Sequence, residues 1–225
     1  MPSYQIRLCR NPECGLRYPL TEGHPFGERC PACLGETEAV HRGGLEREVP
    51  READDLPEGA RLRVLLDNLR SAWNVGSILR TADGFGFEHA YLCGITPTPE
   101  KAEVRKTALG AEAFVTWSAH PNALEQVQKL MDEGWTVLAL EKVKASVPLQ
   151  AATHLLLDTP SVLVLGNEVT GVDPGILAEA DRVVHIPMRG QKRSFNVAVA
   201  FAIAAAIIHN DLVMYPWWTS DEDVW

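Results

Sequence analysis

The sequence of 225 residues predicts an α/β domain with a mostly parallel β-sheet, preceded by a small cysteine-rich module. From about residue 61 onward, short aliphatic runs alternate with longer helical segments, which is the order of a sheet whose strands are joined by crossover helices. The aliphatic runs are apolar along their whole length, as strands covered on both faces require. Four of the five cysteines lie within the first 33 residues and mark a separate unit.

Six aliphatic runs are expected to form the strands of the sheet. They span residues 62–66, 90–93, 114–117, 136–140, 162–165 and 183–186. Helices are expected between and after them, at residues 75–85, 99–111, 122–133, 174–180 and 196–209. A nucleotide-like ligand of such a sheet binds at the carboxyl ends of the strands, so site residues are expected in the segments that follow the strands.

The composition fits a soluble globular protein, with 46% hydrophobic and 23% charged residues. No apolar run approaches the ~18 residues that span a bilayer, and the first residues lack the apolar core of a signal peptide. We therefore expect a cytoplasmic protein with no membrane partner. The formal net charge of −9 argues against coating nucleic acid by bulk charge. Basic residues at 101–106 and 189–193 still allow RNA to bind along a local stripe.

The N-terminal cysteines have the spacing of a metal site. Cys9 and Cys14 are separated by four residues, Cys30 and Cys33 by two, and 15 residues lie between the pairs. Two such pairs, brought together by a hairpin, supply the four thiolates of a tetrahedral zinc site. Two disulfides or unrelated free thiols are the alternatives, and a cytoplasmic location disfavours the disulfides. Four thiolates leave no open coordination position, so we expect structural zinc in a recruitment or RNA-contact module.

Shifts in composition divide the chain into parts. We expect a zinc ribbon at residues 1–40, a linker at 41–60, the α/β domain at 61–215 and a short acidic tail at 216–225. The linker is rich in glycine, proline and charged residues and has little apolar periodicity. Cys93 lies alone in an apolar run and is expected in the core. The ribbon and the α/β domain are therefore expected to be independent units.

Polar residues and glycines concentrate after three of the expected strands, at residues 67–82, 166–171 and 187–197. Each block also has an ordinary structural interpretation. Asn74 could cap a helix, and Arg80 could lie on a solvated face. The second block could be a turn before the next helix, and Ser194 or Asn196 could cap the last helix. Taken together, in this order and spacing, the blocks predict one composite site.

The three blocks resemble the signature motifs of the SpoU/TrmH branch of the SPOUT RNA methyltransferases. They read Asn74-x-Gly76-Ser77-x-x-Arg80-Thr81-Ala82, Leu165-Gly166-Asn167-Glu168-x-x-Gly171, and Ile186-Pro187-Met188 followed by Ser194-x-Asn196-Val197. The resemblance covers residues from about 61 to 211. The cysteine module is not part of the common core of that family, so the resemblance does not explain it.

The resemblance implies a SPOUT fold with a C-terminal trefoil knot, a rare exception to the rule that chains do not thread loops. It further implies that S-adenosylmethionine binds in the knot, that the protein is a homodimer, and that it methylates a ribose 2′-hydroxyl in tRNA or rRNA. The expected cofactor-binding residues are Ala139, Leu140, Leu165, Gly166, Asn167, Gly171, Ile186, Met188, Ser194, Phe195 and Asn196.

The resemblance also assigns catalytic residues. Arg80, assisted by Asn74, is expected to activate the ribose hydroxyl, either as a general base or as a guanidinium that clamps the adjacent phosphate. A base role needs strong perturbation, because arginine is protonated at neutral pH. Glu168 and Asn196 are expected to hold the motif loops together. Basic residues at 189–193 are expected to contact RNA phosphates.

Two other functions stay open at this point. A catalytically silent RNA-binding or assembly factor could keep the fold and dock through the zinc ribbon, although the presence of all the motif residues favours an enzyme. A base methyltransferase from another SPOUT branch is disfavoured by the block from Asn74 to Arg80.

Overall fold

The computed structural model describes residues 3–21, 23–24, 27–45, 60–156 and 159–218. The chain divides into two compact units, residues 1–52 and 53–225. No helix in the described ranges is long and apolar enough to cross a membrane.

The first unit is an antiparallel three-stranded sheet in the order β2-β1-β3. Its strands are β1 (Ser3–Cys9), β2 (Arg17–Thr21) and β3 (Thr37–Gly44). Strand β3 continues four residues past the predicted end of the ribbon at residue 40, because residues 41–44 pair with the first half of β1. Most of the predicted linker, residues 46–59, lies outside the described residues.

The second unit is built on a seven-stranded sheet in the order β6-β5-β4-β9-β7-β10-β8, and every adjacent pair is parallel. The strands are β4 (Leu62–Asp67), β5 (Phe87–Cys93), β6 (Thr116–His120), β7 (Thr136–Leu140), β8 (Val147–Pro148), β9 (Ser161–Leu165) and β10 (Arg182–His185). The prediction of a mostly parallel α/β sheet is confirmed.

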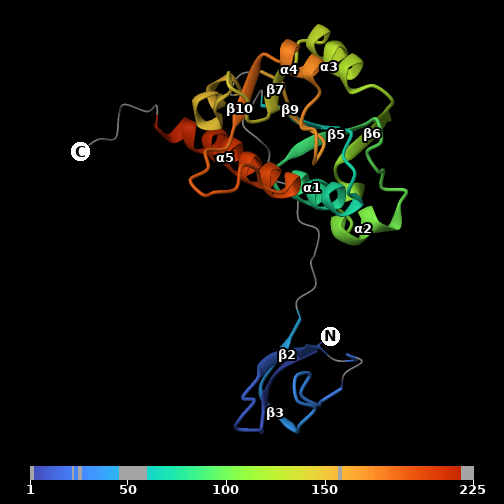
Figure 1. The fold of residues 1–225 in the computed structure, drawn as a ribbon, viewed down its shortest axis with the longest axis vertical. Helices are drawn as coiled ribbons and strands as arrows, with labels where there is room; N and C mark the ends of the chain where they lie inside the picture. The colour runs from blue at the N-terminus through green and yellow to red at the C-terminus, as the bar shows by residue number, and fades with distance from the viewer. Residues whose placement is uncertain (1–2, 22, 25–26, 46–59, 157–158, 219–225) are drawn as a thin grey trace, which may run out of the picture. The chain divides into compact units, whose positions relative to one another are not determined.

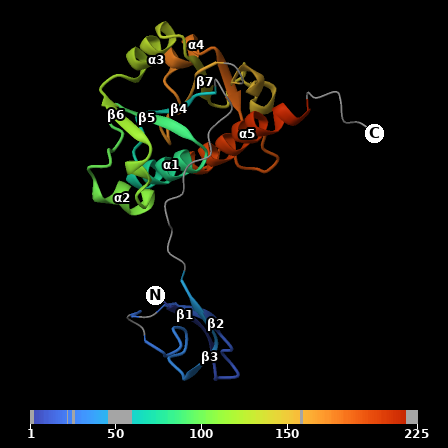
Figure 2. The same cartoon turned by 180° about the vertical axis from the view of Figure 1, so that it is seen from behind.

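Helices cover both faces of this sheet. They are α1 (Ala72–Gly84), α2 (Ala102–Ala108), α3 (Ala123–Asp132), α4 (Pro174–Glu179) and α5 (Val197–Trp218), with short 3₁₀ helices at Ala111–Ala113, Leu149–Ala151 and Thr153–Leu156. Figures 1 and 2 show α3 and α4 on one face and α1 and α5 on the other. A buried apolar cluster fills each side, with Phe201 of α5 in one and Ile176 of α4 in the other.

Several elements differ from their predicted bounds, and three of these differences have identifiable reasons. The strand predicted at 114–117 begins at Thr116, because Ala111–Ala113 form a 3₁₀ turn and leave Phe114 exposed. Helix α2 ends at Ala108, where Leu109 and Gly110 adopt left-handed backbone angles with φ of 52° and 98°. Helix α5 runs past residue 209 into the predicted tail, of which residues 219–225 lie outside the described residues.

The topology brings the loops that carry the second and third motifs to one edge of the sheet. Strand β9 lies between β4 and β7, and β10 lies between β7 and β8. Because parallel strands end at the same edge, the segments after β7, β9 and β10 meet there. The trefoil knot is expected in this region and stays a prediction.

Candidate active site and zinc site

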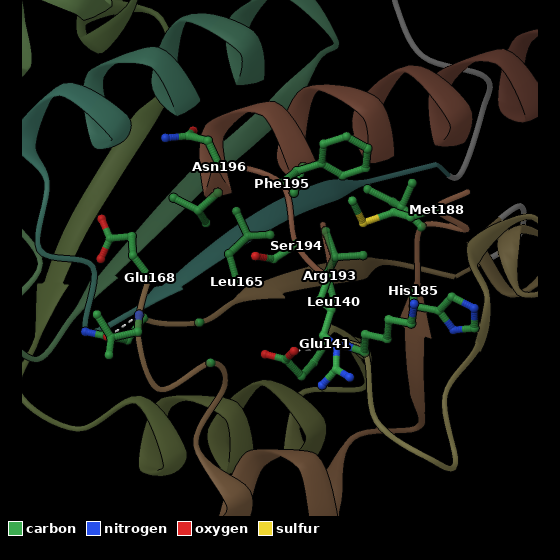
Figure 3. Close-up of a pocket in the computed structure, with 18 residues that line it drawn as sticks. Leu140, Glu141, Leu165, Glu168, His185, Met188, Arg193, Ser194, Phe195 and Asn196 are labelled. Atoms are coloured by element: carbon green, nitrogen blue, oxygen red, sulfur yellow. Dashed lines mark hydrogen bonds between the residues drawn. The ribbon is translucent and has the colours of Figure 1, made fainter. Parts of the chain in front are cut away.

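A cavity of about 310 Å³ lies at the carboxyl edge of the sheet. It is lined by residues at the ends of β7, β9 and β10, by the loops that follow these strands and by the first turn of α5. Figure 3 shows Glu168 and Asn196 on one side of the cavity and Met188 and His185 on the other.

The loop after β9 forms one wall of this cavity, and its two glycines are required by close backbone approach. Asn167 and Gly171 exchange two backbone hydrogen bonds of 3.0 and 2.9 Å, which close the loop. A Cβ atom at Gly166 would overlap the backbone of Gly171 and Val172. Gly171 has φ of +77°, and a Cβ atom there would meet the Glu141 carboxylate.

The Asn167 side chain ties this loop to the segment between β4 and the first motif. Its Oδ1 accepts the backbone N–H groups of Val169 at 2.9 Å and Thr170 at 3.2 Å. Its Nδ2 donates to the carbonyl oxygen of Asn68 at 2.6 Å. These three partners are backbone groups of the protein, so the side chain shapes the cavity wall.

One chain of hydrogen bonds connects all three motifs. Glu168 Oε1 accepts from Asn74 Nδ2 at 3.0 Å, and Asn74 Oδ1 accepts from Asn196 Nδ2 at 3.0 Å. Glu168 also accepts the backbone N–H groups of Arg70 at 2.9 Å and Ser71 at 3.0 Å, so both of its oxygens are engaged. These contacts fix the relative positions of segments that are about a hundred residues apart in the sequence.

These donors also determine the charge state of Glu168. Partial burial would raise the pKa of its carboxyl group, but the backbone N–H groups of Arg70, Glu168 and Ser71 and the Asn74 amide together hold that pKa below its usual value. Glu168 is therefore a carboxylate at neutral pH and acts as a hydrogen-bond acceptor that organises the site.

The structure also decides between the capping alternatives. Helix α1 is capped by Ser71, whose hydroxyl accepts the Asn74 N–H, so Asn74 is not the cap and its side chain is available to the site. Asn196 precedes α5 and its Oδ1 accepts the N–H of Ala198 at 2.9 Å, so Asn196, and not Ser194, caps that helix.

Most of the predicted cofactor-binding residues line the cavity. Those that do are Leu140, Leu165, Gly166, Asn167, Gly171, Ile186, Met188, Ser194, Phe195 and Asn196. Ala139 does not, because successive side chains of a strand point to opposite faces and Ala139 is 0% exposed in the core beside α3 and α4. Of the predicted catalytic residues, Glu168 lines the cavity. Asn74 lies outside the lining and is hydrogen-bonded to Glu168, and Arg80 is exposed on α1 outside the lining.

Several lining residues were not predicted from the sequence as cofactor contacts. They are Glu141, Lys142, Glu168, Val169, His185, Arg193, Val197 and Ala200. Position alone could have identified three of these, because Glu141 and Lys142 directly follow β7 and His185 ends β10. Arg193 was expected to contact RNA phosphates. It lines the cavity, and its contact with RNA stays a prediction.

The cavity suits S-adenosylmethionine. Its volume of about 310 Å³ is within the ~300–1,000 Å³ of small-molecule sites. Leu165, Ile186 and Met188 supply apolar walls, and Gly166 lets the backbone come close to a ligand. The apolar walls suit the uncharged adenine end of the cofactor, and the polar and charged residues of the lining suit its amino-acid end.

The four N-terminal thiols suit zinc. The Sγ atoms of Cys9, Cys14, Cys30 and Cys33 all lie within 4.8 Å of one another. The Sγ–Sγ distance is 3.4 Å from Cys9 to Cys33 and 3.7 Å from Cys14 to Cys30. Tetrahedral zinc with Zn–S bonds of ~2.3 Å separates its sulfur ligands by about 3.8 Å. None of these cysteines forms a disulfide, so the disulfide alternative is wrong and the cluster has the geometry of structural zinc.

Comparison with known proteins identifies the family to which the second unit is similar. A model of the SpoU rRNA Methylase family matches residues 61–206, and the cysteine module lies outside this match. The tRNA (guanosine(18)-2'-O)-methyltransferase of Thermus thermophilus is 32% identical over 170 residues, covering 76% of this chain and 82% of that protein. The 23S rRNA (guanosine-2'-O-)-methyltransferase RlmB of Pseudomonas aeruginosa is 30% identical over 190 residues, covering 80% and 75%.

Solved structures agree with these sequence matches. The TrmH/SpoU tRNA modifying enzyme of A. aeolicus superposes with a TM-score of 0.63 at 27% identity, covering 70% of this chain and 78% of that chain. The AdoMet-bound rRNA methyltransferase from Sinorhizobium meliloti gives a TM-score of 0.62 at 27% identity, covering 70% and 59%. The chain therefore belongs to the SpoU family of S-adenosylmethionine-dependent RNA 2′-O-ribose methyltransferases.

Proposed function

We propose that this chain methylates a ribose 2′-hydroxyl in tRNA or rRNA, in the cytoplasm and as a homodimer. The observation that carries the proposal is the hydrogen-bonded connection of Asn74, Glu168 and Asn196. It joins side chains from all three motifs beside a cavity that suits the cofactor.

When bound, the cofactor supplies an electrophilic methyl group on a positively charged sulfur. The protein has to hold that methyl group in line with a ribose oxygen, and orientation of this kind contributes much of the rate. Leu165, Ile186 and Met188 form apolar walls that exclude water from one side of the reacting groups. Asn74 and Asn196 fix the edge of the cavity, where the ribose enters.

Arg80 is assigned the role of a phosphate clamp. It is exposed on α1 and lies outside the cavity lining, which supports a contact with RNA rather than with the cofactor. A guanidinium is charged at neutral pH and binds phosphate oxygens in a bidentate manner. By holding the phosphate next to the target nucleotide, Arg80 aligns the hydroxyl for transfer.

The homodimer is supported by apolar side chains exposed around the cavity. Val169 is 72% exposed, Phe195 is 40% exposed and Val199 is 47% exposed. Covering them with a second copy removes apolar surface from water. We expect light scattering at micromolar concentration to give the mass of a dimer, and Val199→Asp to give a monomer, while Val147→Asp on β8 leaves the mass unchanged. A monomeric wild type would overturn this part of the proposal.

The reaction is tested by transfer of labelled methyl from S-adenosylmethionine to total tRNA and, separately, to rRNA. Digestion of the product identifies 2′-O-methyl nucleosides and excludes base methylation. Arg80→Ala should lower transfer at least a hundredfold, since removing one electrostatic contact of this kind costs roughly 10²–10³ in rate. Arg182→Ala is the matched control, because Arg182 begins β10 at the edge of the sheet away from the cavity.

The outcomes separate the competing functions. Labelled 2′-O-methyl nucleosides from the wild type and the control, but not from Arg80→Ala, support the proposal. Cofactor binding without transfer to any RNA would favour the catalytically silent RNA-binding factor instead. Label found on bases would favour the base methyltransferase.

A further inference from the structure

Glu141 has an unusual place in the cavity wall. It directly follows β7, and its backbone N–H continues the pairing with β10 by donating to the Val184 carbonyl at 2.9 Å. Its carboxylate accepts the N–H of Val172 at 3.1 Å through Oε2 and the N–H of Lys142 at 2.9 Å through Oε1. Two backbone donors from different segments therefore hold a carboxylate at the cavity (Figure 3).

Gly171 makes this placement possible. A side chain at residue 171 would occupy the position of the Glu141 carboxylate, so the second motif ends in a residue that leaves room for it. The carboxylate also links β7 to the loop after β9, because Val172 belongs to that loop. The position of Glu141 is thus part of the construction of the cavity.

Among the residues that the structure describes, none forms an ion pair with Glu141. Lys142 and Arg193 also line the cavity, but both side chains are exposed and can remain in water. The other acidic residue of the lining, Glu168, is already engaged by the N–H groups of Arg70 and Ser71 and by the Asn74 amide. A fixed carboxylate without a cationic partner is complementary to a cationic ligand.

We propose that Glu141 is a specificity-determining residue that favours the positively charged methyl donor over the neutral thioether left after transfer. This inference rests on the proposed function. The two ligands have the same adenosine and amino-acid groups and differ by the methyl group and the unit charge on sulfur. The carboxylate therefore stabilises the substrate form of the cofactor selectively and promotes exchange of the spent product for fresh donor.

The expected size of the effect follows from Coulomb's law. We take a separation of about 7 Å between the Glu141 carboxylate and the sulfur of a ligand in this cavity. At an effective dielectric constant of about 20, with screening by solvent at the open side, one charge at this distance changes the ratio of the two affinities about tenfold. An effect of this size is readily measured by calorimetry.

Titration calorimetry with S-adenosylmethionine and with S-adenosylhomocysteine tests the proposal directly, without RNA. The ratio of the two dissociation constants is compared between wild type and Glu141→Gln, which is nearly isosteric and keeps an oxygen acceptor. We expect this substitution to shift the ratio about tenfold toward the thioether. Glu103→Gln, the same charge change on the exposed side of α2, should leave the ratio as in wild type.

Glu141→Asp separates charge from tethering. It keeps the charge but shortens the reach to Val172, so it should weaken both ligands while preserving most of their ratio. If Glu141→Gln weakens both ligands equally, or changes neither, the charge role is overturned and Glu141 only supports the wall. If the wild type binds neither ligand, the proposed function itself fails, which is a different result.

Discussion

The Nδ2 of Asn196 donates a 3.0 Å hydrogen bond to the Oδ1 of Asn74, a residue 122 positions earlier in the chain. The orientation of the Asn74 amide is set independently, because its own Nδ2 donates to Glu168. The Asn196 amide is set by α5, whose first N–H groups bond to its Oδ1. A change at Asn74 therefore alters the geometry of both other motifs.

Asn74→Asp should separate this organising role from folding. The substitution keeps the size of the side chain, but it replaces the Nδ2 donor with an oxygen beside the Glu168 carboxylate. The hydrogen bond becomes a like-charge contact, so we expect methyl transfer to fall about a hundredfold while the chain stays folded. Steady-state transfer rates and circular dichroism measure the two effects.

The matched control for this substitution is Asn210→Asp, at an exposed position of α5. It makes the same chemical change away from the cavity and should leave transfer unchanged. Equal rates for the two variants would show that the connection between Asn74 and Glu168 does not organise the reaction.

The surroundings of Gly76 and Gly84 predict that alanine substitutions at these two positions of α1 differ in their effect on stability. A Cβ atom at Gly76 would overlap the Thr107 hydroxyl and the Val104 carbonyl of α2, whereas a Cβ atom at Gly84, also in α1, would have open space around it. Gly76→Ala should lower the free energy of unfolding by about 1–3 kcal/mol. Gly84→Ala should leave it unchanged or raise it by up to ~1 kcal/mol.

Urea denaturation of both alanine variants provides the comparison. If Gly76→Ala were as stable as Gly84→Ala, α2 would not pack closely on α1, and the glycine of the first motif would have to be explained by ligand contact. The structural explanation is therefore separable from the catalytic one.

The sequence predicted those features that depend on local pattern. Strand β7 has the predicted bounds of 136–140, because an apolar run between Gly134, with φ of 85°, and the polar Glu141 has clear ends. The cysteine cluster was predicted because ligand spacing is itself a geometric constraint. Asn196 was one of two residues expected to cap α5, since asparagine is a favoured capping residue.

Features that depend on distant contacts were not predictable in this way. Ala139 and Leu140 are adjacent and both apolar, and only the packing of α3 and α4 decides that Ala139 faces the core. The role of Glu141 depends on the space left by Gly171, 30 residues later. The exposure of Phe114 depends on a 3₁₀ turn that interrupts an otherwise strand-like apolar sequence.

His89 is part of a polar network on the sheet formed by β5 and β6. Its Nδ1 lies 2.7 Å from the Thr116 hydroxyl and its Nε2 lies 2.8 Å from the Ser118 hydroxyl. Thr116 donates to a backbone carbonyl, which assigns the proton to Nδ1 and leaves Nε2 as an acceptor. Burial, Arg63 and His120 together lower the pKa of His89 to about 4, against an opposing effect of Glu88.

This low pKa makes stability depend on pH in a defined window. A histidine of the unfolded chain has a pKa of about 6.5. Between pH 6.5 and 4 the unfolded chain therefore binds a proton that the folded chain does not, and the free energy of unfolding falls as the pH falls. The loss should be roughly 1–2 kcal/mol after allowance for the half-exposed ring.

Chemical denaturation at pH values from 7.5 to 4 measures this loss. His89→Gln lacks the titrating ring and should show a weaker pH dependence than wild type, whereas exposed His154→Gln should follow the wild-type curve. Parallel curves for all three proteins would assign the acid sensitivity to other groups.

Zinc removal tests whether the N-terminal module is independent of the catalytic unit. The four thiols converge within the first unit, residues 1–52, whereas the cavity is built wholly from the second unit. Cys30→Ser should therefore abolish the binding of one zinc ion per chain and unfold the module, because structural zinc contributes directly to folding. The affinity of the cavity for S-adenosylmethionine should change less than twofold, and RNA binding should weaken.

Cys93→Ala, which removes a buried thiol outside the cluster, should keep the zinc. Metal analysis and calorimetry give the two readouts, and parallel loss of zinc and cofactor binding in Cys30→Ser would show that the two units fold as one.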